Sequence, residues 1–254
     1  MIFELILIGI GVGIISGFFG VGGGMILVPT LMAIGIDIKT AIAVSVVQMV
    51  FSSYYGSYLN YKKGLLKLNE GIWVGVGGII GGIIGARFTD ILPKETLEYI
   101  FLALVIFALI KVVTAKKPHE TQEEGSFSKV TLFFIGLVIG VIAMMLGVGG
   151  SIMLTPILVG FLHFPTKKAA TAGLFFVVFS STAGFFYKLV AGTFNNLNMP
   201  ISYIFALAIA AVIGVIIGIK LKDVIKDSHH KISLIILYLI ILLLLINKIF
   251  LQGN

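Results

Sequence analysis

The sequence has little charge and no cysteine. Only 11% of its 254 residues are charged, whereas a soluble globular domain uses about 25%. So few charged side chains cannot cover a water-facing surface, which excludes a soluble enzyme, a disordered protein and a nucleic-acid-binding protein. The lack of cysteine excludes a disulfide framework and a cysteine-ligated metal. Acidic residues are missing from the middle of every hydrophobic run, which disfavours cation transport because intramembrane acids usually mark cation and proton sites.

Apolar residues and glycine dominate instead. Hydrophobic residues make up 59% of the chain, which also contains 31 glycines. One membrane span needs about 20 apolar residues, and the chain has eight blocks of about that length or longer. The blocks cover residues 2–34, 40–60, 71–89, 96–114, 130–163, 169–190, 199–219 and 232–250. The pattern predicts an all-α polytopic membrane protein, integral to the cell (inner) membrane.

The sequence repeats itself. Gly20–Pro29 matches Gly147–Pro156 without gaps at an offset of 127 residues. Later in each half, two Gly-x-x-x-Gly segments, whose spacing predicts ridges for close helix packing, end near Arg87 and Lys220 and match at an offset of 133. A fused duplication is therefore predicted. Its parts are a first half over residues 1–115, a polar linker over 116–128 and a second half over 129–254.

The first block of each half is too long for one span. Residues 2–34 as one helix would run about 50 Å, against a hydrocarbon core of about 30 Å. Each block either crosses once as a broken helix or turns at its glycines and returns to its own side. The returning geometry puts 13 of the 18 Lys and Arg on one side, a positive-inside bias that an even division lacks. It makes the four-block halves inverted repeats with re-entrant first helices and both termini outside.

The two glycine turns are candidate anion sites. Each precedes a short apolar run, so its N–H groups would lie at a helix N-terminus, which favours negative charge. Inverted repeats would bring both turns together near the midplane. The alternative is that these glycines only allow close helix packing, but the recurrence of Pro29 and Pro156 favours a site with a structural or gating proline. The turn residues are Gly20, Gly22, Gly23, Gly24, Gly147, Gly149, Gly150 and Ser151.

A polar stripe on the next block of each half supplies further candidates. Gln48 is the strongest of them, because burying its amide unpaired would be costly. Its counterpart region in the second half has no amide, so binding would be asymmetric. The hydroxyl candidates could instead make ordinary interhelical hydrogen bonds. They are Ser52, Ser53, Thr171, Ser180 and Ser181.

Arg87 and Lys220 end matched segments of the two halves. They either attract anions at the two mouths of a pathway or anchor the helices at the membrane surface, with their charged ends in water. No arrangement of acid, base and nucleophile converges at membrane depth, so the sequence predicts no enzyme, no catalytic residue, no metal site and no cofactor.

The doubled motif resembles the sulfite exporter TauE/SafE family over nearly the whole chain. It reads Gly17-Phe18-Phe19-Gly20-Val21-Gly22-Gly23-Gly24 with Pro29, and Leu146-Gly147-Val148-Gly149-Gly150-Ser151 with Pro156. The resemblance implies a permease for sulfur-containing anions such as sulfite and organosulfonates, with both turns along the path.

Together these features predict a secondary transporter that exports a small sulfur-containing anion by alternating access at a midplane site. The expected partners are that anion and membrane lipid, without nucleic acid, and a homo-oligomer is left open. Two alternatives remain at this point: a passive anion channel and a non-transporting membrane scaffold or assembly protein.

Overall fold

The computed structural model describes residues 2–20, 22–64, 68–114, 128–160, 166–197, 199–224 and 227–251. Within these ranges the chain forms ten α-helices and no β-strand. The helices are α1 (Ile2–Phe19), α2 (Gly24–Ala33), α3 (Ile38–Lys62), α4 (Leu68–Ile91), α5 (Lys94–Thr114), α6 (Lys129–Leu146), α7 (Ser151–Gly160), α8 (Thr166–Val190), α9 (Ile201–Val224) and α10 (Asp227–Ile246).

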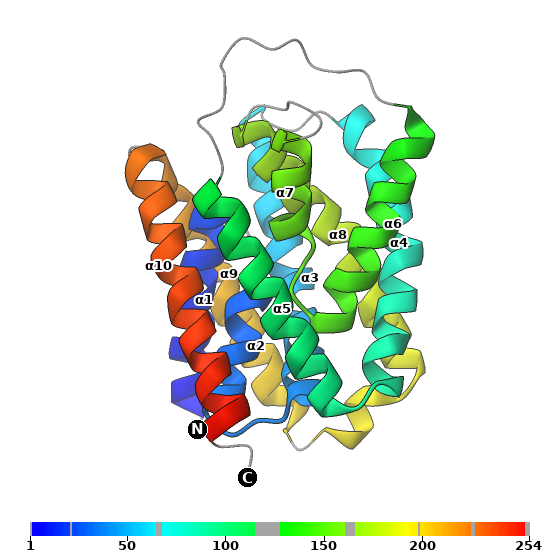
Figure 1. Cartoon of the computed structure of the whole chain (residues 1–254), viewed down its shortest axis with the longest axis vertical. Helices are drawn as coiled ribbons and strands as arrows, with labels where there is room; N and C mark the ends of the chain where they lie inside the picture. Colours follow the sequence, from blue (N-terminus) through cyan, green and yellow to red (C-terminus); the bar gives the residue numbers. More distant parts are fainter. Residues whose placement is uncertain are drawn as a thin grey trace.

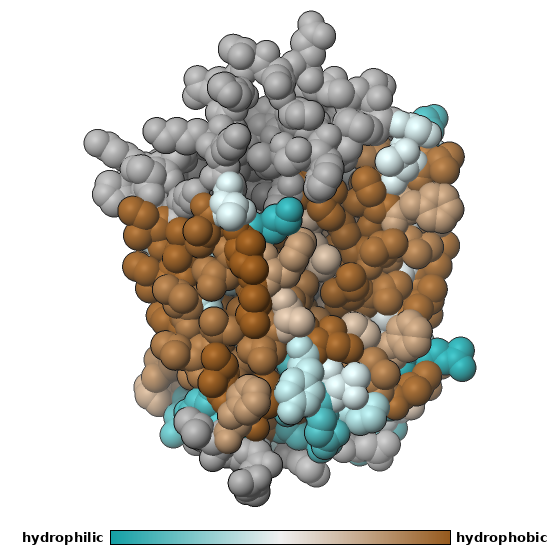
Figure 2. All heavy atoms as spheres, in the orientation of Figure 1, coloured by the Kyte–Doolittle hydropathy of each residue, from teal (hydrophilic) through white to brown (hydrophobic). Residues whose placement is uncertain are grey.

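Seven of these helices are long and apolar enough to cross a membrane: α1, α4, α5, α6, α8, α9 and α10. α3 is 25 residues long but carries a polar stripe, and α2 and α7 have ten residues each. Figure 2 shows a broad hydrophobic band across the middle of the visible face, with hydrophilic residues along its lower border. The all-α polytopic fold predicted from the hydrophobic blocks is confirmed.

The first block of each half is broken at its glycines. α1 ends at Phe19 and α2 begins at Gly24, while α6 ends at Leu146 and α7 begins at Ser151. Ten residues span about 15 Å, so α2 and α7 reach only halfway through a bilayer. α1 begins, α10 ends and α2 joins α3 at the lower end of the bundle in Figure 1, here named the terminal end. The first block therefore turns back toward the end where it began.

Two helix pairs pack closely through glycine. α1 lies along α9, where a side chain at Gly9 would overlap the backbone of Leu207. α4 lies along α6, where a side chain at Gly136 would overlap the backbone of Val74. The second contact is the first with the halves exchanged, at the offsets of 127 and 133 seen in the sequence. Such backbone contact requires small residues, so the Gly-x-x-x-Gly segments are packing ridges, as predicted.

The remaining helices enclose the two turns. α3 packs against α8, α2 against α3, α7 against α8, and α5 against α10. The α1–α2 and α6–α7 turns therefore lie between helices of both halves. Of the predicted linker, residues 116–127 lie outside the described residues; α5 ends at Thr114, and Ser128 caps the N-terminus of α6. The division into halves stays a prediction.

Candidate anion site at the glycine turns

The α1–α2 and α6–α7 turns need glycine for their backbone geometry. Gly23 is the N-cap of α2 with φ of 75°, and Gly147 is the C-cap of α6 with φ of 65°. Both values lie in the left-handed region that only glycine adopts without strain. The sequence therefore breaks the long first blocks at these points because the chain can reverse there.

The two turns contact each other in the interior. A side chain at Gly24 would overlap the carbonyl oxygen of Gly147, and one at Gly22 would lie 3.7 Å from both Gly149 Cα and Ser151 Oγ. Ser45 on α3 donates a hydrogen bond to the same Gly147 carbonyl, with 2.7 Å between Oγ and O. The turns predicted to converge are thus packed backbone to backbone, and these residues are buried.

Fewer backbone donors are available than the sequence suggested. The Gly24 N–H already donates to the Gly22 carbonyl at 2.9 Å. The N–H groups of Ile26 and Leu27 both donate to the Gly23 carbonyl, at 3.1 and 3.0 Å. The α2 helix nevertheless begins at this turn. The positive end of the α2 dipole therefore points toward the junction of the two turns.

Gln48 on α3 is the strongest polar feature beside the turns. Its side chain is fully buried, and neither Nε2 nor Oε1 has a hydrogen-bond partner. An ideal Cβ placed on Gly23 would lie 2.7 Å from each of these two atoms, so the amide lies directly against the turn. An unpaired buried polar group costs about 1–3 kcal/mol. A free donor and a free acceptor therefore face the N-terminus of α2 at a cost in stability.

The second half has an aromatic ring in the corresponding place. A side chain at Gly150 would overlap the ring of Phe176 on α8, as one at Gly23 would meet Gln48. Phe176 is buried and has no hydrogen-bonding atom in its side chain. The asymmetry predicted from the sequence is therefore present in the packing, and the hydrogen-bonding capacity lies on the Gln48 side.

The hydroxyl candidates differ in their hydrogen bonding. Ser52, Ser53 and Ser180 donate to carbonyls of their own helices at 3.3 to 3.5 Å, so they are already occupied. Ser181 is fully buried without a partner for its Oγ. Thr171 is buried five residues before Phe176 on α8. Gln48 and Ser181 are thus the two predicted site residues whose buried polar atoms lack protein partners.

The remaining candidates lie away from the turns or are structural. Arg87 and Lys220 are exposed near the C-termini of α4 and α9, and those helices end at opposite ends of the bundle (Figure 1). Pro29 is buried within α2. Pro156 falls within α7, but its side chain lies outside the described residues.

A charged cluster at the terminal end was not anticipated. Lys188, near the end of α8, is fully buried, and its Nζ lies 3.4 Å from Asp90 Oδ1 on α4. Lys188 was not among the site candidates that the sequence suggested. The available signal was a lone lysine within the apolar segment Phe185–Val190.

Asp37 holds the start of α3 at the same end. Its carboxylate accepts hydrogen bonds from the Lys39 and Thr40 N–H groups, and it lies 3.5 Å from Lys94 Nζ. Partial burial acts to raise the pKa of Asp37, but the bonds from Thr40 and the Lys94 charge outweigh it and hold the pKa below 3.8. Asp37 is therefore ionised at neutral pH and caps the helix as an anion.

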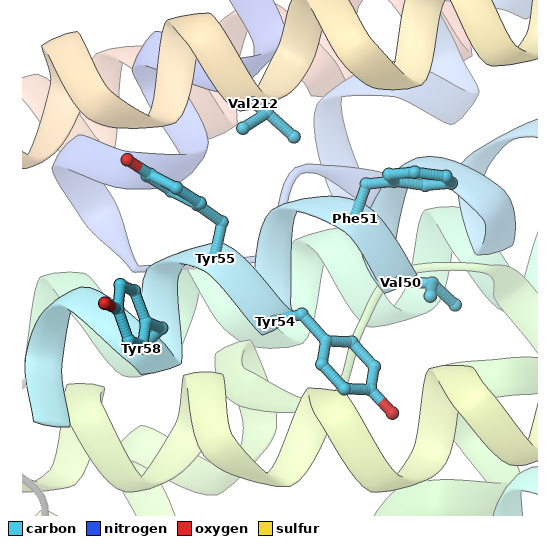
Figure 3. Close-up of a pocket in the computed structure, with 6 residues that line it drawn as sticks. All are labelled: Val50, Phe51, Tyr54, Tyr55, Tyr58 and Val212. Carbon is cyan, nitrogen blue, oxygen red and sulfur yellow. The ribbon is translucent and has the colours of Figure 1, made fainter.

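A separate hollow lies on the outer side of α3. It has a volume of about 520 Å³ and is lined by Val50, Phe51, Tyr54, Tyr55, Tyr58 and Val212. Figure 3 shows Tyr55 and Phe51 on the side of α3 that faces Val212 of α9, and Tyr54 directed away from α9. None of these lining residues belongs to the turns, so the hollow is distinct from the candidate anion site.

These features define an integral multi-pass membrane protein with two buried glycine turns. The "Sulfite exporter TauE/SafE" family model matches residues 5–245. The chain belongs to this family, which is a family of membrane transporters and not an enzyme class.

Several proteins similar to this chain carry the name "Probable membrane transporter protein". One from Methanocaldococcus jannaschii is 26% identical over 247 residues, covering 91% of this chain and 90% of the relative. YunE from Bacillus subtilis is 22% identical and covers 98% and 97%. YdhB from the same organism is 28% identical over 152 residues, which is 58% of this chain and 62% of that relative's length. No solved structure gives a significant match.

Proposed function

We propose that this transporter exports a small sulfur-containing anion, such as sulfite or an organosulfonate, across the inner membrane. The family description supports sulfite as the first substrate to test. The observation on which the site rests is the unpaired, fully buried Gln48 amide against the Gly23 turn. A natural sequence retains such an energetic cost most readily where a ligand satisfies the group.

The chemistry of the turns suits a weakly held anion. The Gln48 Nε2 would donate to the anion oxygens, and Ser181 has a further unpaired hydroxyl. The positive end of the α2 dipole would favour the negative charge. Neutral donors at the positive end of a helix bind anions without a buried cation. A transported ion must also leave its site, and neutral donors would release it more readily than a buried lysine would.

We further infer that the halves are inverted repeats that rock about the paired turns. The duplicated glycine contacts of α1 with α9 and of α4 with α6 support a two-fold relation. The opposite directions of α1 and α6 in Figure 1 support inversion. Transporters with this design bind their substrates near the midplane, between the repeats. The tight packing of both turns then corresponds to a conformation that is closed around the site. In this arrangement both termini lie outside the cell.

Sulfite flux in proteoliposomes tests the function. We expect sulfite uptake to saturate as the sulfite concentration rises. We also expect labelled sulfite on one side of the membrane to exchange with unlabelled sulfite on the other. A passive channel predicts flux without saturation or exchange, and a scaffold predicts none above empty liposomes. Organosulfonates and sulfate, added as competitors, define the anion class.

Cysteine accessibility tests the inverted arrangement separately, because the chain contains no native cysteine. Positions 39 and 167 begin α3 and α8 at equivalent places in the two halves. Lys39→Cys should be labelled by an impermeant reagent from outside the cell and Lys167→Cys only from inside. Labelling of both variants from the same side would contradict inverted repeats.

A further inference from the structure

Lys188 is a fully buried cation that the midplane site does not use. It lies in the last turn of α8, with 0% of its side chain exposed. Burial of an ammonium group is costly unless opposite charge and hydrogen bonds compensate it. Within the described part of the chain, the structure pairs Lys188 with Asp90 in the last turn of α4, at 3.4 Å between Nζ and Oδ1.

This ion pair is loose on the Asp90 side. Its distance of 3.4 Å exceeds the usual 2.7–2.9 Å of a charge-assisted hydrogen bond. The Asp90 side chain is 32% exposed, so water reaches the carboxylate from the terminal end. Lys39 donates a hydrogen bond to the backbone carbonyl of Asp90 at 2.9 Å, which holds the end of α4 without using the Asp90 carboxylate.

We propose that Lys188 is a second anion site of this transporter and that the Asp90 carboxylate occupies it when no substrate is present. A carboxylate and a sulfur oxyanion both present negatively charged oxygens, which are the groups that an ammonium binds. An oxyanion arriving from the terminal end replaces Asp90 at Lys188, and Asp90 turns to water. The ligand class is thus the small oxyanion of the proposed function, on which this inference rests.

The exchange also changes how the two halves are held together. Asp90 belongs to α4 of the first half and Lys188 to α8 of the second, so their ion pair joins the halves at the terminal end. Replacement of Asp90 by a free anion breaks this link while keeping Lys188 compensated. Binding at this end is thereby coupled to loosening of α4 from α8.

Sulfite titrations of the purified protein in detergent test the site, with the increase in thermal midpoint as the readout. Asp90→Asn removes the competing carboxylate, so the half-saturating sulfite concentration should fall about tenfold, which corresponds to about 1.4 kcal/mol. Lys188→Met should abolish the effect of the Asp90 substitution, so Asp90→Asn with Lys188→Met should behave like Lys188→Met. Asp37→Asn, which removes the carboxylate paired with the exposed Lys94, is the matched control and should titrate like the wild type.

The same titrations in a Gln48→Met background isolate Lys188 from the midplane site. A response that persists there and disappears with Lys188→Met supports the second site even if sulfite flux proves absent. A half-saturating concentration unchanged by Asp90→Asn would overturn the inference while leaving the proposed transport intact.

A purely structural ion pair predicts different behaviour. Neutral replacement of both partners of a buried pair is often tolerated, so in that case the double variant would regain the sulfite dependence of the wild type, which would refute the proposal. If Asp90→Asn alone does not fold, Lys188→Met and the double variant still decide, since both must weaken the sulfite response in the Gln48→Met background.

Discussion

Replacement of Gln48 by methionine should make the protein more stable and a poorer transporter. Methionine has nearly the volume of glutamine and adapts to irregular cores, so the packing against Gly23 is kept. It removes two buried polar atoms that lack partners, each of which costs about 1–3 kcal/mol in a soluble protein. In membranes the unfolded state also finds partners, so we expect the lower value, about 1 kcal/mol, and a thermal midpoint raised by about 2–4 °C.

The effect on transport should have the opposite sign. A hydrogen bond to an anion contributes about 1.5–3 kcal/mol, so its loss should raise the half-saturating sulfite concentration by about 10- to 150-fold. Thermal unfolding in detergent and sulfite flux in proteoliposomes measure the two effects on one preparation. Stabilisation together with unchanged half-saturation would refute the assignment of Gln48 to the site.

Ser57→Ala is the matched control for this experiment. Ser57 lies on the same helix, and its buried Oγ also lacks a partner. It follows Gln48 by nine residues, which is about 13 Å along the helix axis. The alanine variant should therefore be more stable, by less than Gln48→Met because only one polar atom is removed, with sulfite flux unchanged. It separates the effect of stabilisation from the effect of losing a ligand group.

Three further predictions concern stability. Gly24→Ala should lower the thermal midpoint strongly, because its Cβ would overlap the Gly147 carbonyl, whereas Gly11→Ala has open space and should raise stability by up to about 1 kcal/mol. Thr89→Val removes a hydroxyl that links α4 to two carbonyls of α6, and should cost about 0.6 kcal/mol; no change would mean that the link is unimportant. Asp37 has a folded pKa below 3.8, so its ionised form stabilises the fold above that value and the effect is lost as the pH falls through the folded pKa. The difference in thermal midpoint between wild type and Asp37→Asn should accordingly be full at about pH 6 and shrink below 3.8, and a difference independent of pH would contradict this assignment.

Much of the fold was predictable because it follows from local composition. Apolar runs of span length form helices in lipid, since only internal hydrogen bonds satisfy the backbone there. The breaks after Phe19 and Leu146 were visible as glycine runs. The Gly-x-x-x-Gly ridges were predicted as packing surfaces, because their four-residue period puts small residues on one helix face.

The sequence predicted which residues belong to the site better than it predicted the hydrogen bonds that they make. The sequence singled out Gln48 and the two turns, and the duplicated pattern predicted that the turns would meet. It did not show that Ser52, Ser53 and Ser180 would bond to their own helices, because a serine in a helix can turn inward to its backbone or outward to a neighbour. Those choices depend on which helices surround each hydroxyl.

The sequence by itself determined that this is an all-helical membrane protein with a repeated glycine motif at which two long apolar blocks break. These properties depend on composition and spacing, which act over a few residues. Only the tertiary structure decided that the amide of Gln48 lies unpaired against Gly23 and that Lys188 is buried beside Asp90. Both depend on contacts between segments distant in the chain, where burial changes the energy of a polar group according to what packs around it.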